Sequence, residues 1–207
     1  MTNKEMKFWQ RVSKFYAPIQ EKTNKELYSQ CVQLCLPYLR QDIDVLELAC
    51  GSGQFTKPLY KKVKRWIASD YSQNMLQETK KRCQDVEISQ QDITHLILED
   101  NSFDLVLIAN ALHLIPDASI ALCEVHRVLK EGGLLIAPNF VYEGKINCVR
   151  MWLTNKVGFR SYYEWNFQEY IDFLEKHGFV VIEKQLICGD PLPEAFVVLQ
   201  KNRFYKI

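Results

Sequence analysis

Short apolar segments alternate with amphipathic ones through the middle of this 207-residue chain, and this alternation constrains the fold more than any other feature. The run at 103–109 (FDLVLIA) is apolar almost throughout, as expected of a strand that is covered on both faces. Repeated strand–helix–strand units predict a parallel sheet with helices on both of its faces. The predicted strands span residues 42–49, 65–69, 86–89, 103–109 and 134–137.

The pattern changes after residue 140, where a turn containing Pro191 and Pro193 separates two strand-like runs. We expect these runs to form an antiparallel pair at one edge of the sheet. The fold class is therefore predicted to be α/β, with a doubly wound, mostly parallel, seven-stranded sheet and an antiparallel last strand. The helices and strands predicted in this part of the chain span 146–157, 167–174, 180–187 and 195–199.

Composition limits the partners and the compartment. Lys and Arg number 26 against 25 for Asp and Glu, so the net charge of +1 supplies no broad field for nucleic acid, and none is expected as a partner. The seven cysteines are an odd, scattered set without C-x-x-C spacing, which predicts reduced thiols, a cytoplasmic protein and no metal site. No apolar run has the length of a membrane span, so we expect none.

A ligand site is predicted beyond the carboxyl ends of the strands, where an open α/β sheet binds its ligands. The first strand runs into ELACGSGQ (residues 47–54), in which Gly51 and Gly53 allow a tight turn and a close approach of the backbone to a ligand. The second strand ends at Asp70, 19 residues beyond Gly51, where a carboxylate can accept hydrogen bonds from both hydroxyls of a ribose. Together these features predict an adenosine-type ligand, the alternative being a plain turn followed by a helix-capping acid.

The same loop discriminates between nucleotide cofactors. A dinucleotide fingerprint needs a third glycine three residues after Gly53, and this chain has Thr56 there. Glu47 would oppose a pyrophosphate but favour a cation, so an NAD(P) oxidoreductase is the weaker alternative. S-adenosylmethionine (SAM) carries a sulfonium and an ammonium group and no phosphate, and it suits this loop better.

Five motifs follow one another along residues 42–140: VLELACGSGQF (45–55), ASDYSQNML (68–76), QQDIT (90–94), FDLVLIANALHLI (103–115) and LKEGGLLIAPNF (129–140). In this order and spacing they resemble the motif series of the class I SAM-dependent methyltransferases. The resemblance implies a Rossmann-like sheet, SAM as the cofactor, S-adenosylhomocysteine as the product and no metal.

Roles for individual residues follow from this resemblance. It implies that Asp70 holds the ribose hydroxyls and that Asp92 hydrogen-bonds the adenine amino group, with Ile93 beside it. Tyr71 and Met75 would pack on the adenine. The residues implied to line the methionine end are Glu47, Ala49, Gly51 and Gly53, and those implied to face the reacting centre are Asn110 and Ala111.

Direct methyl transfer chiefly requires that the acceptor be oriented, and a general base helps only when the acceptor carries a proton. His113, after the fourth strand, and Tyr16 are the candidate bases. Neither the Asn/Asp-Pro-Pro-aromatic motif of adenine-amine or glutamine methyltransferases nor the Pro-Cys pair of cytosine C5 enzymes is present.

Aromatic residues are concentrated after the fifth strand and favour an apolar, aromatic or amine-bearing small-molecule acceptor. We expect a single domain over 1–207, with 1–40 as a helical lid and 140–165 as an aromatic cap, in a monomer or homodimer. Methylation of tRNA or of a protein side chain, or a non-catalytic SAM-binding module, are the alternatives. The aromatic residues concerned are Phe140, Tyr142, Trp152, Phe159, Tyr162, Tyr163 and Trp165, with Trp9, Phe15 and Tyr16 from the N-terminal segment.

Overall fold

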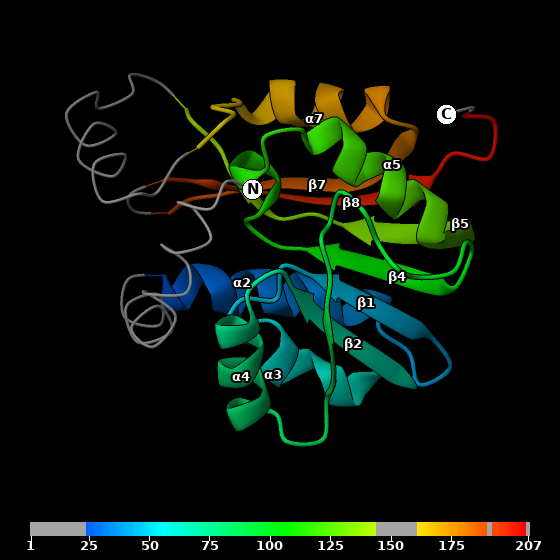
Figure 1. The fold of residues 1–207 in the computed structure, drawn as a ribbon. Helices are drawn as coiled ribbons and strands as arrows, with labels where there is room; N and C mark the ends of the chain where they lie inside the picture. Colours follow the sequence, from blue (N-terminus) through cyan, green and yellow to red (C-terminus); the bar gives the residue numbers. More distant parts are fainter. Residues whose placement is uncertain (1–23, 144–160, 190–191, 206–207) are drawn as a thin grey trace.

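The computed structural model describes residues 24–143, 161–189 and 192–205, which form a twisted sheet with helices on both faces (Figure 1). The strands are β1 (Asp44–Leu48), β2 (Arg65–Asp70), β3 (Glu87–Gln90), β4 (Phe103–Ile108), β5 (Leu129–Ile136), β6 (Asn139–Phe140), β7 (Phe179–Ile187) and β8 (Glu194–Lys201). The α-helices are α2 (Lys25–Cys35), α3 (Thr56–Leu59), α4 (Gln73–Arg82), α5 (Ala118–Val128) and α7 (Phe167–Lys176). Short 3-10 turns follow at η1 (Leu36–Tyr38), η2 (Tyr60–Lys62) and η3 (Leu112–Leu114).

The order of the strands in the sheet reverses at β1. Its order is β3-β2-β1-β4-β5-β8, with β7 on the outer side of β8, and β1 pairs in parallel with both β2 and β4. Leu46, for example, lies opposite Ile67 on one side and Val106 on the other. Because the chain winds outward from β1 in both directions, the carboxyl ends of β1 and β4 diverge into separate loops, which is where open α/β sheets bind ligands.

The predicted fold class is confirmed, including the antiparallel pair at the edge, because β8 runs antiparallel to both β5 and β7. An eighth strand, β6, is added to the seven predicted ones. It pairs with β8 on the same side as β5, so it continues β5 beyond Pro138. Proline has no N–H to give to the ladder, which explains the interruption.

A glycine pair, Gly132 and Gly133, follows α5 in the sequence and would favour the end of a helix, but the boundary between α5 and β5 lies before it. The helix ends at Val128, and the strand begins at Leu129, where that residue pairs with Phe103. Gly132 and Gly133 lie inside β5 instead. A side chain at Gly133 would meet the Lys130 carbonyl oxygen at 2.8 Å, so this part of β5 requires glycine for close backbone packing.

Helix starts follow local capping chemistry. Ser72, a residue type that is typical of a helix N-cap, accepts a hydrogen bond from the backbone N–H of Met75 at the start of α4. Asp117 does the same for Ser119 and Ile120 at the start of α5. None of the described helices has both the length and the apolarity needed to cross a membrane.

Two apolar cores lie on opposite faces of the sheet. Alternate side chains of β4 divide between them: Val106 and Ile108 pack toward α5 and α7, whereas Leu105 and Leu107 pack toward α2, α3 and α4. Figure 1 shows these two groups of helices on the two sides of the strands. Burial on both faces explains the unbroken apolar run that the sequence shows at this strand.

Two parts of the predicted organisation remain predictions. The expected helix at 146–157 lies outside the described residues, as do most of the lid (1–40) and of the cap insertion (140–165).

Alanine substitutions of buried and of exposed aliphatic residues should differ greatly in their effect on the free energy of unfolding. Leu107 in β4 is 1% exposed, whereas Ile97 in the loop before β4 is 80% exposed. We expect Leu107→Ala to lower the free energy of unfolding by about 2–5 kcal/mol, because it removes apolar contact and leaves a cavity. Ile97→Ala, as the matched control, should change it by less than about 0.5 kcal/mol. Urea unfolding monitored by circular dichroism measures both, and equal effects would contradict this assignment of the core.

Candidate functional site

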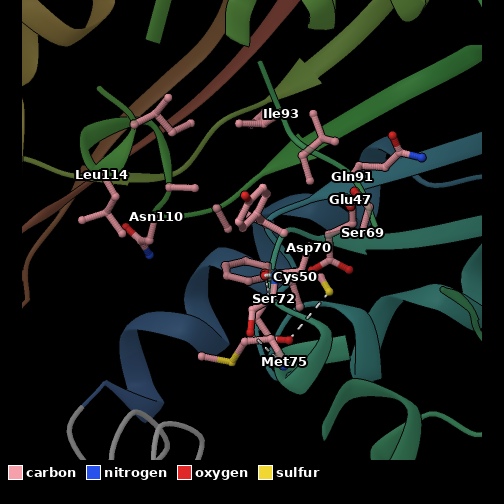
Figure 2. Close-up of a pocket in the computed structure, with 18 of the residues that line it drawn as sticks. Glu47, Cys50, Ser69, Asp70, Ser72, Met75, Gln91, Ile93, Asn110 and Leu114 are labelled. Carbon is pink, nitrogen blue, oxygen red and sulfur yellow. Dashed lines mark hydrogen bonds between the residues drawn. The ribbon is translucent and has the colours of Figure 1, made fainter. Parts of the chain in front are cut away.

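A cavity opens at the carboxyl ends of β1, β2 and β4, at the point where the strand order reverses (Figure 2). In Figure 2, Glu47 and Asp70 lie on one side of it and Asn110 and Leu114 on the other. All of the residues predicted to bind the cofactor line it, except Gly53. The complete lining is residues 47–51, 54–55, 69–72, 91–94, 109–111 and 114–116, together with Tyr28 and Met75.

Asp70 organises the loop between β1 and α3. Its Oδ2 accepts a hydrogen bond of 2.9 Å from the Gly51 N–H, and its Oδ1 accepts one of 2.8 Å from the Ser72 N–H. The carboxylate thus ties the glycine loop to the start of α4 while its remaining lone pairs are available to a ligand. Burial raises the pKa of Asp70 to about 6, although the hydrogen bonds from these two amides oppose the rise.

Three alternate residues of this loop have left-handed backbone. Gly51 and Gly53 have φ of 57° and 82°, and Ala49 has φ of 53° despite its side chain. A side chain at Gly53 would meet Thr79 at 3.2 Å, so this glycine lets the loop pack closely on α4. Gly53 therefore lies behind the cavity wall and supports the loop without lining the cavity.

Glu47 is buried beneath the loop, with 2% of its surface exposed. Its Oε2 accepts hydrogen bonds from the Thr56 hydroxyl at 2.5 Å and from the Trp66 indole N–H at 2.9 Å. Thr56, the residue that replaces the third glycine of a dinucleotide loop, therefore orients this carboxyl group. Burial raises the pKa of Glu47 to about 7, against the effect of these two donors.

The charge of the lining is entirely acidic. Glu47, Asp70 and Asp92 contribute carboxyl groups, and the described lining contains no Lys, Arg or His. The Oδ1 atom of Asp92 accepts hydrogen bonds from the N–H and the hydroxyl of Thr94, which fixes its position at the end of β3. Such a lining can stabilise a cationic ligand and disfavours a phosphate.

His113 lies outside the cavity lining. It is 2% exposed, its Nδ1 is 2.8 Å from Asn139 Oδ1, and its ring packs edge-on against Phe140. Burial lowers the pKa of His113 to about 4, which the Asn139 hydrogen bond only partly offsets. The other candidate base, Tyr16, lies outside the described residues, as do Trp9 and Phe15.

The described aromatic residues of the predicted cap pack against the body of the protein. Tyr163 and Trp165 stack at 4.4 Å with an interplanar angle of 8°, and Trp165 contacts Phe173 of α7 at 4.7 Å. The Tyr163 hydroxyl donates to the Pro116 carbonyl. None of Phe140, Tyr142, Tyr162, Tyr163 and Trp165 lines the cavity, while Trp152 and Phe159 lie outside the described residues.

A different aromatic pair lines the cavity and was not predicted from the sequence. Tyr28 of α2 and Phe55 at the start of α3 contact edge to face with 5.5 Å between ring centroids. Phe55 follows the glycine loop directly, so its proximity to the loop could have been inferred. Tyr28 reaches the cavity because α2 packs beside the loop. The local sequence pattern does not predict this contact between distant segments.

Metal-ligating side chains do not gather at this site. In the part of the chain that the structure describes, no three His, Cys, Asp or Glu residues form a group that could hold a metal ion. The described cysteines are free thiols, and Cys31, Cys35, Cys50 and Cys83 are buried.

Residues 46–137 match the protein family described as "Methyltransferase domain". Among curated proteins, the chain is similar to demethylmenaquinone methyltransferase of Staphylococcus aureus, with 36% identity over 104 residues. That match covers 47% of this chain and 43% of the relative, so the chain spans less than half the length of the curated relatives it matches.

Solved structures share the fold over most of the chain. A SAM-dependent methyltransferase from Thermotoga maritima, described as a possible histamine N-methyltransferase, aligns with a TM-score of 0.74 and 24% identity over 96% of this chain and 99% of that one. A SAM-dependent methyltransferase from Methanosarcina mazei aligns with a TM-score of 0.67 and 18% identity over 82% and 97% of the two chains. At these identities the likeness establishes the fold, and the resemblance drawn from the motifs is confirmed.

The buried carboxyl groups predict how stability depends on pH in the absence of ligand. Glu47 has a raised pKa of about 7 in the folded protein, so between pH 6.5 and 8 the folded state binds more protons than the unfolded state. The free energy of unfolding should therefore fall as pH rises through this window. Urea unfolding at several pH values measures the slope.

Glu47→Gln is the matched control, because its amide oxygen can still accept from Thr56 and Trp66 but cannot ionise. We expect this variant to lose less stability than the parent between pH 6.5 and 8. Identical slopes for parent and variant would contradict the assignment of a raised pKa to Glu47.

Proposed function

Because residues 46–137 form a methyltransferase domain and the chain has the class I fold, we propose that this protein transfers a methyl group from SAM to a small-molecule acceptor, with S-adenosylhomocysteine as the product. The observation that carries the proposal is the acidic lining of the cavity, with three carboxyl groups and no cationic side chain among the described lining residues. A ligand with two positive charges and no phosphate fits this lining, whereas a dinucleotide does not.

The strand ends suggest how the ligand would lie. Asp70, held by two backbone amides, would accept hydrogen bonds from the ribose hydroxyls, and Asp92 would accept one from the adenine amino group. Tyr71, Met75 and Ile93 also line the cavity and would pack on the adenine. In this proposal the methionine end lies along Glu47, Ala49 and Gly51, with Gly53 as support behind them, and the reacting centre lies near Asn110 and Ala111.

When bound, the cofactor supplies an electrophilic methyl group on a sulfonium whose positive charge disappears on transfer. The protein's part is to hold the two reactants in line and to exclude water, and such orientation is worth about 7–11 kcal/mol. The carboxyl groups of Glu47 and Asp70 stabilise the more positive ligand and therefore bind the product less tightly. Loss of one ligand charge inside an acidic cavity favours product release.

We propose no acid–base role for His113. Its burial, its hydrogen bond to Asn139 and its position outside the lining support a role in holding the loop after β4 against β6. Tyr16 remains a candidate base from the sequence alone.

A neutral or amine-bearing acceptor without phosphate fits the described lining best. Leu114 lies on the side of the cavity away from Glu47 (Figure 2). Its neighbours Ile115 and Pro116 add apolar surface to the lining, and Tyr28 and Phe55 add aromatic surface. The Staphylococcus aureus relatives are named for demethylmenaquinone, which makes this compound the first acceptor to test. The free thiols of the described cysteines support a cytoplasmic location.

The activity is tested with tritiated SAM, purified protein and three sets of acceptors: demethylmenaquinone, a small-molecule cell extract, and separate tRNA and protein fractions. We expect label in a small molecule only when the protein is present. Label confined to a tRNA or protein fraction would contradict the proposal. SAM binding without transfer to any fraction would indicate a binding module.

Asp70→Asn tests the ribose contact. The substitution removes a charged acceptor and places an amide donor beside the Gly51 or Ser72 N–H, so SAM affinity should fall about 10- to 100-fold, equivalent to about 1.5–3 kcal/mol. Isothermal titration calorimetry with SAM measures the change. Asp85→Asn is the control, because Asp85 is 80% exposed in its side chain and lies in a surface ion pair. An unchanged affinity in Asp70→Asn, or preference of the parent protein for NADH over SAM, would contradict the proposed site.

His113→Gln tests the absence of a base at this position. We expect the dependence of kcat/KM on pH to keep the shape of the parent's profile, because His113 is buried and has a pKa of about 4. Disappearance of one limb of the profile in the variant would show that His113 exchanges a proton during the reaction.

A further inference from the structure

The turn after β4 is held in an uncommon backbone conformation by one side chain. Asn110 has φ of 53°, the left-handed region, although it is not a glycine. Its backbone N–H donates to the Pro138 carbonyl at 2.8 Å, its side-chain Oδ1 accepts from the Phe140 N–H at 2.9 Å, and its Nδ2 donates to Glu194 Oε1 at 3.0 Å. A single residue thus connects the end of β4 with β6 and β8.

The two side-chain hydrogen bonds of Asn110 go to residues that lie next to each other in the sheet. Phe140 and Glu194 are direct partners in the antiparallel pairing of β6 with β8. The Asn110 amide therefore bridges a residue pair that lies across two strands. Because Oδ1 already accepts from Phe140, this amide is committed to the protein rather than presented to an acceptor amine, as the missing Pro-Pro-aromatic sequence also indicates.

Glu194 is an unusual residue for its position. It begins β8, where the five following residues are buried and apolar, and it is itself 0% exposed. Among the described residues its Oε2 has no hydrogen-bond partner at normal distance, although the nearby Cys31 thiol favours the charged carboxylate. The ionisable groups that face it are the thiols of Cys31 and Cys35 on α2 and the phenol of Tyr170 on α7, so no cation compensates the carboxyl group among the described residues.

A buried, incompletely paired carboxyl group is costly, and a larger apolar side chain would cost less at a purely structural position. Burial raises the pKa of Glu194 to about 8, which expresses the same cost. Asn110, a residue of the cavity wall, donates the hydrogen bond of 3.0 Å to Glu194, and an apolar residue at position 194 could not accept it.

We propose that Glu194 is a positioning residue of the transfer site, which acts through Asn110 to hold the turn after β4 as a rigid wall at the reacting centre. This inference rests on the proposed function. In-line transfer depends on placing the acceptor accurately. Residues 109–111 line the cavity, and Asn110 lies on the side opposite Glu47 and Asp70 (Figure 2). The role requires the hydrogen-bond acceptor at residue 194 and not its charge.

Three substitutions separate these features. Glu194→Gln keeps an oxygen acceptor for Asn110, Glu194→Met keeps the length but removes the acceptor, and Asn110→Gly keeps the left-handed turn but removes the amide. We expect Glu194→Gln to retain the rate of label transfer from tritiated SAM to the small-molecule extract within threefold. Glu194→Met should lose at least tenfold in rate, while its dissociation constant for SAM changes less than threefold.

A double-mutant cycle tests whether Glu194 acts through Asn110. In the Asn110→Gly background, Glu194→Met should change the rate by less than twofold. Full additivity of the two substitutions, or a parental rate in Glu194→Met alone, would overturn the proposal. If Glu194→Met does not fold, Asn110→Gly decides: a rate lowered tenfold with unchanged SAM affinity supports the clamp, and a parental rate overturns it.

Amide hydrogen exchange gives a readout that does not depend on methyl transfer. The N–H groups of Asn110 and Phe140 both donate within this cluster, so Glu194→Met should accelerate their exchange at least tenfold, and Glu194→Gln should not. Unchanged exchange in Glu194→Met would overturn the clamp. Failure of the proposed function would instead be seen as a parent protein that neither binds SAM nor transfers label.

Discussion

The parallel pairing of β1 with β2 on one side and with β4 on the other is the constraint on which the rest of the structure depends. Since the chain winds away from β1 in both directions, the loops after β1 and β4 part and leave a cavity between them. Two buried cores, one on each face of the sheet, hold these strands in register. The position of the cavity is thus a consequence of chain topology, whereas its chemistry comes from the residues that end each strand.

Acidic side chains lie close together at these strand ends, where their carboxyl groups are poorly hydrated. Glu47 and Asp70 are each held by two hydrogen-bond donors, and burial nevertheless raises the pKa of both. Without a ligand this arrangement costs free energy, because the carboxyl groups lose hydration that their donors only partly replace. In the proposed function, a cationic ligand offsets that cost by supplying opposite charge.

Asn110 and Glu194 extend the same principle to the other wall of the cavity. Here a left-handed residue and a buried carboxyl group, each unfavourable alone, are joined by a hydrogen bond that connects β4 to β8. Asp70 holds the turn after β1 in a comparable way through the Gly51 N–H. Both walls are therefore fixed by side-chain-to-loop hydrogen bonds, and the packing of apolar residues supports them from below.

Local chemistry explains what the amino-acid sequence revealed: the alternation of strands and helices, the cap at Ser72, the glycine loop and the acids at Glu47, Asp70 and Asp92 all depend on neighbouring residues. Contacts between distant segments decided the rest. Tyr28 lines the cavity, His113 is withdrawn beside Asn139, and Tyr163 and Trp165 pack toward α7 because of how whole elements dock. Residues 110 and 194 are 84 positions apart in the sequence. Folding brings the end of β4 beside the start of β8, and only this contact reveals the two residues as a pair.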